Sequence, residues 1–134
     1  MSFFEDLLEI EVLGVSRVPL DEIERLLALA LASAGIDAGH VAVEFVSAER
    51  IAQLNVEHRG TRGPTDVLSF PVDGDDPTPG PRELGDIVIC PQHTVDVREA
   101  IVHGALHLAG MDHETDDGEM LALQREIMAW VTPS

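Results

Sequence analysis

Three of the six histidines in the chain lie within eleven residues, and their spacing suits a metal site. An α-helix completes a turn in about 3.6 residues, so His103 and His107 fall on the same helix face. Gly110 predicts the end of that helix, and the residues after it can return His113 toward the pair. Three neutral imidazoles are typical zinc ligands that leave one tetrahedral position open for water. We therefore predict a catalytic metal site formed by these histidines; the alternative is two core histidines and a third that faces solvent.

The residue after the first histidine limits the kind of chemistry. In zinc peptidases of the His-Glu-x-x-His type that position is a glutamate, which acts as general base. Here it is Gly104, so an ordinary zinc peptidase is not expected. A glycine inside a helix costs about 1 kcal/mol relative to alanine. Its presence indicates either close packing of the helix or room for substrate beside the metal, and the sequence leaves both open.

Composition limits the class of protein. With 134 residues, 45% of them apolar, the chain is expected to form one domain over residues 1–134 with a buried core. No stretch approaches the roughly 20 apolar residues of a membrane helix, and the N-terminal residues do not resemble a signal peptide. The only cysteine, Cys90, is expected to be a buried strand thiol, and we predict a cytoplasmic protein without a membrane partner.

The charge balance bears on possible partners. Eight arginines, with no lysine, oppose 25 acidic residues and give a formal net charge of −17. Such a chain repels polyanions at long range. Binding of nucleic acid would therefore need a local patch of arginine together with the metal, and composition alone argues against it.

Hydrophobic periodicity predicts strands that alternate with helices in one α/β layer of about four strands. Four prolines and two glycines in segment 71–83 predict a mobile surface loop, with disorder favoured. The predicted strands are Leu8–Leu13, Val41–Phe45, Thr65–Phe70 and Gly85–Cys90. The predicted helices run from Pro19 to Gly35, from Ser47 to near Gly60, from about Thr94 to Ala109, and from near Asp116, with Glu119 as its capping-box partner.

Four segments of the chain resemble the YbeY family. They occur in the family's order and cover roughly residues 40 to 130. The histidine motif and the Thr-Asp-Val-Leu-Ser-Phe run that begins at Thr65 are the specific ones. The segments are Leu54–Arg59, Pro64–Pro71, Gly85–Ile89 and His103–His113.

This resemblance implies a zincin-like α/β (α+β) fold, in which one mixed sheet packs with four to five helices and a C-terminal-half helix carries the metal site. It implies a zinc-dependent, single-strand-specific endoribonuclease that acts in 16S ribosomal RNA 3′-end maturation and ribosome quality control. His103, His107 and His113 match the family's zinc ligands, for one ion per chain, and Arg59 matches an arginine that faces substrate. The implied partners are single-stranded and ribosomal RNA, with small-subunit ribosomal proteins or an assembly GTPase, and not DNA.

The chemistry expected of this site is phosphodiester hydrolysis. Zinc polarises phosphoryl oxygens and lowers the pKa of bound water to about 7, although three imidazoles also suit nickel and copper. The planar fork of Arg59 can pair with phosphate and offset developing charge. We expect the metal and Arg59 to grip one phosphodiester while water or the substrate's 2′-OH attacks, and the sequence leaves the nucleophile open. Without the resemblance, Arg59 would be read as a surface arginine at a helix C-terminus.

Three further residues have two interpretations each. Asp66 either orients a ligand histidine or belongs to a turn. Asp112 either accepts a hydrogen bond from a ligand imidazole or caps the turn after Gly110. His58, at a position where the family often has an aromatic residue, either binds substrate or donates a proton, or it has no role.

A short connection leaves alternatives to the endoribonuclease. Only twelve residues separate Cys90 from His103, where the family usually has about another helix. One alternative is a metal hydrolase of a small ester or amide, its RNA role lost with the missing segment. The other is a ribosome-assembly factor in which zinc is structural.

Overall fold

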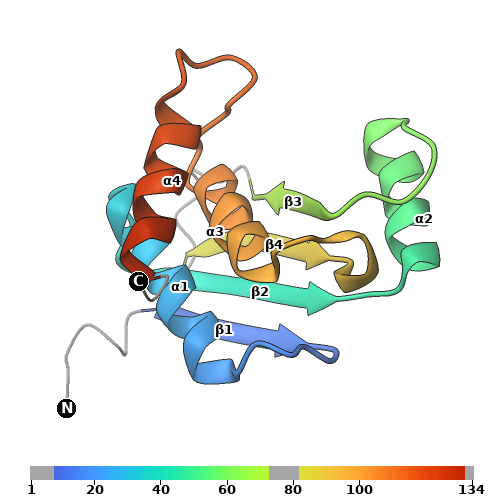
Figure 1. Ribbon diagram of the computed structural model, residues 1–134, viewed down its shortest axis with the longest axis horizontal. Coiled ribbons are helices and arrows are strands. Elements are labelled where there is room, and N and C mark those ends of the chain that lie inside the picture. Colours follow the sequence, from blue (N-terminus) through green and yellow to red (C-terminus); the bar gives the residue numbers. More distant parts are fainter. Residues whose placement is uncertain (1–7, 73–81, 132–134) are drawn as a thin grey trace.

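The computed structural model of the chain describes residues 8–72 and 82–131 and shows a mixed four-stranded sheet packed with helices (Figure 1). The predicted α/β class is confirmed. No helix in these two ranges is long and apolar enough to cross a membrane. The strands are β1 (Leu8–Leu13), β2 (Gly39–Phe45), β3 (Val67–Pro71) and β4 (Glu83–Ile89); the helices are α1 (Leu20–Ser33), α2 (Ala48–Arg59), the 3-10 turn η1 (Pro91–His93), α3 (Val97–Leu108) and α4 (Glu119–Val131).

The strand order β1-β2-β4-β3 places β3 at an edge of the sheet. β1, β2 and β4 run parallel, whereas β3 pairs antiparallel with β4, Leu68 opposite Val88. In the described part of the chain β3 pairs with β4 alone, so its outer backbone edge is open. Most of the loop predicted between these strands, residues 73–81, lies outside the described residues.

The two faces of the sheet have separate cores. Helices α1, α3 and α4 pack on one face, where alternate strand residues such as Val43 and Ile87 are fully buried. On the other face, Ile51 and Leu54 of α2 pack against β3 and β4. Figure 1 shows α2 standing apart from the other helices. Cys90 is free and fully buried in this second core, as predicted, although it lies just after β4 and not within the strand.

Two helix starts were placed three residues too early from the sequence. Thr94 is not helical: its hydroxyl donates to the carbonyl of Cys90 at 2.6 Å, and Asp96 caps α3 instead, accepting from the backbone of Arg98. Asp116 precedes α4 and accepts from the backbone N–H of Met120. The carboxylate of Glu119 accepts from Asp117 N–H and not from Asp116 N–H, so the expected capping box between Asp116 and Glu119 does not form. Polar side chains that bond to nearby backbone groups compete with the helix at both places.

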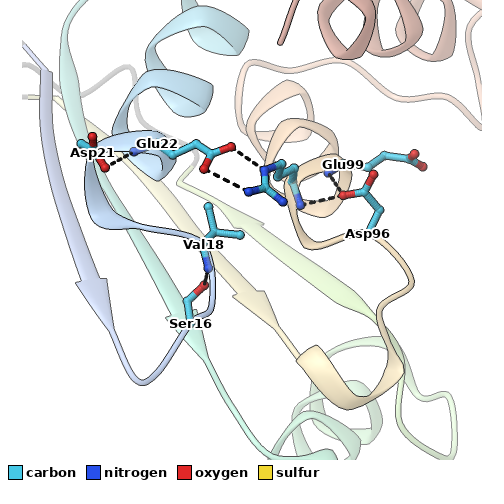
Figure 2. Close-up of polar contacts among 7 residues, drawn as sticks. Ser16, Val18, Asp21, Glu22, Asp96 and Glu99 are labelled. Carbon is cyan, nitrogen blue, oxygen red and sulfur yellow. Dashed lines mark hydrogen bonds and ion pairs between the residues drawn. The ribbon is translucent and has the colours of Figure 1, made fainter. Parts of the chain in front are cut away.

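An ion pair joins the start of α1 to the start of α3. The guanidinium of Arg98 donates through both Nε and a terminal nitrogen to the two carboxylate oxygens of Glu22 (Figure 2). This hydrogen bonding lowers the pKa of Glu22. In the same view Asp96 and Glu99 lie beside the pair. The Asp96 carboxylate accepts from the backbone N–H groups of Arg98 and Glu99 at the start of α3. The pair therefore links the N-terminal end of α3, the helix that carries His103 and His107, to the start of α1.

Gly104 allows α3 to lie close to the sheet. It is buried, and a Cβ built on it would lie 2.6 Å from Cγ2 of Ile87 on β4. Real Cβ atoms do not approach other carbons so closely. Of the two interpretations of Gly104, close packing is therefore the one that the structure supports.

Replacing Gly104 with alanine should destabilise the fold although alanine is the better helix former. Overpacking against Ile87 outweighs the gain in helix propensity, for a net loss of about 1–2 kcal/mol in the free energy of unfolding. Urea unfolding of Gly104→Ala, Ile87→Ala and the double variant would measure it. The double variant should lose less than the sum of the single losses; strict additivity would contradict the contact.

Candidate metal centre

The three histidines converge at the C-terminal end of α3. His103 and His107 lie one turn apart on the helix, and the chain turns at Gly110, at φ 96°, to bring His113 back. The ring centroids lie 4.7, 5.0 and 5.1 Å apart. One nitrogen from each ring lies within 4.8 Å of the others, and all three residues are half-buried. In the described ranges no other group of His, Cys, Asp or Glu side chains is placed to hold a metal.

Hydrogen bonds determine which nitrogen of two rings carries the proton. His103 Nδ1 lies 2.7 Å from the amide oxygen of Gln124, and His107 Nδ1 lies 3.0 Å from the carbonyl oxygen of Met111. Both oxygens can only accept, so both Nδ1 atoms must donate. In the neutral rings the Nε2 atoms of His103 and His107 therefore carry lone pairs free to bind a metal.

The distance between these two nitrogens fits a shared cation. They lie 3.2 Å apart, and without a proton on either one their lone pairs repel each other. Tetrahedral zinc with bonds of about 2.0–2.1 Å to nitrogen would place its ligand atoms about 3.3 Å apart. Nδ1 of His113 is buried and has no hydrogen-bond partner in the described part of the chain. Buried polar atoms are rarely left without a partner, because this is energetically unfavourable. The residues present thus fit a metal held by three imidazoles.

The surroundings favour the neutral form of His107. Burial lowers its pKa, and the neighbouring His103 and His113 lower it further, against smaller opposing effects of the Met111 carbonyl and Asp112. A neutral imidazole is the form that binds metal. The surroundings of His107 therefore favour the protonation state that a metal ligand needs.

The histidines open onto a cleft of about 1600 Å³. Its walls include the edge strand β3 and the C-terminal end of α2, so the cleft also contains Arg59. The side chain of Arg59 is exposed and has no hydrogen bond or ion pair with any described residue. The structure thus places Arg59 and the three histidines around one cavity.

Asn55, one helical turn before Arg59, holds the loop that follows α2. It is only 3% exposed, and its side-chain N–H donates to the carbonyl of Gly63 at 2.9 Å. The helix ends at Gly60 in a left-handed conformation, at φ 68°. Sequence reasoning did not assign Asn55 a role; an amide on the buried face of a short helix was the available signal.

Two acidic candidates belong to turns. Asp66 Oδ1 accepts from the N–H of Val67 at 2.9 Å and bonds no histidine. Asp112 Oδ1 accepts from the N–H of Glu114 at 3.0 Å and hydrogen-bonds to none of the three imidazoles; the acceptor beside His107 Nδ1 is the carbonyl oxygen of Met111. The capping interpretations of Asp66 and Asp112 are therefore the correct ones.

The remaining histidines differ in their relation to the cleft. His58 lines it and stacks edge-on against Phe70 of β3, with ring centroids 4.8 Å apart. His93, to which the sequence assigned no role, also lines it. His40 lies elsewhere, 3.0 Å from the carboxylate of Glu83, and that hydrogen bond raises its pKa.

The short connection between Cys90 and His103 also forms part of the cleft wall. It contains η1 and the first turns of α3, and Thr94, Asp96 and Glu99 line the cavity. The short connection thus supplies part of the cleft wall beside the histidines.

Comparisons with known proteins agree on one family. The sequence model of the family described as "Endoribonuclease YbeY" matches residues 17–132. A protein of that name from Rubrobacter xylanophilus is 40% identical over 124 residues, which cover 88% of this chain and 89% of the relative. One from Corynebacterium glutamicum is 38% identical over 109 residues, and the match spans 56% of its length. The solution structure of TM1509 from Thermotoga maritima matches with a TM-score of 0.54 and 31% identity, over 88% of this chain and 85% of that one.

Proposed function

Because the chain belongs to the YbeY family of endoribonucleases, we propose that it is a zinc-dependent enzyme that cuts single-stranded RNA. The observation that carries the proposal is the close approach of the Nε2 atoms of His103 and His107, 3.2 Å apart at the wall of an open cleft, while Nδ1 of each ring lies beside a hydrogen-bond acceptor. His103, His107 and His113 are the proposed ligands of one zinc ion. Bound there, zinc would polarise a phosphoryl oxygen and lower the pKa of water.

Arg59 is the proposed phosphate-binding residue. Its guanidinium is free of other partners among the described residues and shares the cleft with the histidines. A planar guanidinium forms two parallel hydrogen bonds to a phosphate and stabilises charge that develops on it. Arg82, a second arginine in the cleft wall, adds positive charge where a chain of net charge −17 would otherwise repel RNA.

The cleft also offers surfaces for an unpaired base. The edge-on pair of His58 and Phe70 lies in its wall, beside the open backbone edge of β3. Bases of single-stranded nucleic acid stack on aromatic side chains, and this stacking depends little on which base is present. This arrangement supports single-stranded rather than duplex RNA as the substrate.

The proposed cellular task rests on the resemblance to the family. We propose that the chain acts in the cytoplasm on ribosomal RNA, in maturation of the 16S 3′ end and in ribosome quality control. Small-subunit ribosomal proteins or an assembly GTPase are the proposed protein partners. Family membership supports these assignments. The chain could cut RNA as proposed even if its cellular substrate or partners were different.

A hydrolase of small esters or amides is the second candidate. The acidic side chains in the cleft wall, among them Asp66, Glu99 and Glu114, favour a substrate with less negative charge than RNA. Hydrolysis of small substrates without RNA cleavage would support this candidate.

An RNA cleavage assay with metal analysis tests the proposal. Protein stripped of metal should be inactive, and one equivalent of zinc should restore cutting of an unstructured RNA but not of a matched duplex. Equal cutting of both substrates would contradict single-strand specificity. Binding of RNA by the zinc-loaded protein without cleavage would instead indicate an assembly factor.

A further inference from the structure

Gln124 is a polar residue on the buried face of the C-terminal helix. It lies on α4 between Met120 and Ile127, both fully buried, and is itself 8% exposed. An amide buried in this way is costly unless it is hydrogen-bonded. Its oxygen accepts from Nδ1 of His103 at 2.7 Å, a distance that indicates a well-formed bond.

The three candidate ligands differ in what supports them. His107 donates to a backbone carbonyl, that of Met111, and Nδ1 of His113 has no hydrogen-bond partner among the described residues. Within the described residues, Gln124 is thus the only side chain that accepts a hydrogen bond from one of these rings.

We propose that Gln124 is a positioning residue that holds His103 as the Nδ1–H tautomer and thereby sets the affinity of the site for metal. This inference rests on the metal centre proposed above. With its proton held on Nδ1, the ring presents an unprotonated Nε2 to the metal, and the bond fixes the ring's orientation. Without the acceptor, His103 can exchange to the Nε2–H tautomer or rotate, and either change removes a ligand atom.

Because α4 provides the acceptor, metal affinity also depends on how α4 packs. Met120 and Ile127 anchor this helix in the core formed with α1 and α3. The site thus joins two helices that are separated in sequence by the turn containing His113. A chain that lost its α4 contact would keep the three histidines but lose affinity for metal.

The test compares three variants of Gln124 with a control on the same helix face. Gln124→Leu removes the acceptor and should weaken zinc binding about 10- to 100-fold, measured by competition with a chromogenic chelator. Gln124→Asn, which shortens the side chain, should also weaken it and serves if the leucine variant does not fold. Gln124→Glu keeps an acceptor and should retain wild-type or tighter binding. Ile127→Leu, a conservative change in the same core, should bind zinc as the wild type does.

A second readout does not depend on zinc. In the metal-free protein, imidazole ¹⁵N NMR should show the His103 proton on Nδ1 in the wild type and in Gln124→Glu, and a mixture of tautomers in Gln124→Leu. Wild-type zinc affinity in a folded Gln124→Leu variant, or an unchanged tautomer, would overturn the inference. A wild-type protein that binds zinc but does not cut RNA would contradict the proposed function and leave the role of Gln124 intact.

Discussion

Replacing His107 with alanine should abolish stoichiometric zinc binding and RNA cleavage together. The substitution removes one of the two nitrogens that lie 3.2 Å apart and leaves His103 and His113 as the only imidazoles in the cluster. Stabilisation of phosphoryl charge by a metal is worth several kcal/mol, so the rate should fall by at least about 10³-fold. Atomic absorption on the purified variant and cleavage of an unstructured RNA measure the two losses.

His40→Gln is the matched control for this experiment. His40 pairs with Glu83 and Glu11 on the sheet, outside the cleft, so its loss should leave zinc content and cleavage unchanged. Cleavage by His107→Ala at the wild-type rate and without metal would point to a contaminating nuclease and would remove the basis of the proposed function. Loss of cleavage with full zinc content would mean that His107 is not a ligand.

The cluster of three histidines could be predicted from the sequence because it depends on local geometry. A spacing of four residues places His103 and His107 on one helix face, and a glycine can reverse the chain before His113. The bond partner of His103 could not be predicted, because Gln124 lies on another helix. Helical periodicity tells which face of α4 is buried but not which atoms that face meets. Met111 was missed for a related reason, since its part in the site is played by the backbone.

In the fold, too, features that depend on local sequence could be predicted, whereas contacts between distant elements could not. Periodicity predicted the four strands and four helices, but it carries no information on strand order. The edge position of β3, which lines the cleft beside the histidines, became visible only in the sheet. Gly104 had two interpretations because its neighbour Ile87 lies seventeen positions earlier, on β4. Asp66 and Asp112 each had a local and a distant possible partner, and in both the nearby backbone N–H prevailed.

Family membership adds what neither spacing nor charge could supply. The formal net charge of −17 argued against RNA, whereas the chain belongs to a family of endoribonucleases. Net charge describes the long-range field, and a local pair of arginines in a cleft can act against it at short range. In the proposed function, Arg59 and Arg82 are therefore the expected phosphate-binding residues.

Replacing Arg59 with alanine should lower turnover about 100-fold while zinc content stays at the wild-type level. Removal of one preorganised donor to developing oxyanion charge typically costs about 10²–10³-fold in rate. Zinc binding should be preserved because Arg59 makes no hydrogen bond to the histidines or to Gln124 in the described chain. Arg59→Lys should recover only part of the loss, since an ammonium group cannot form the two parallel bonds of a guanidinium.

Arg62→Ala is the control, because Arg62 is exposed in the loop just after α2 but does not line the cleft. It removes the same charge from nearly the same place, so a general effect of charge on RNA association would affect both variants alike. An equal loss in Arg62→Ala would mean that Arg59 acts through the long-range field and not by gripping a phosphate. Loss of zinc from Arg59→Ala would show that it supports the metal site, and unchanged turnover would make it an ordinary helix-end arginine. Measuring kcat and KM separately at two salt concentrations distinguishes these outcomes, because charge steering is screened by salt and a direct contact in the cleft is screened far less.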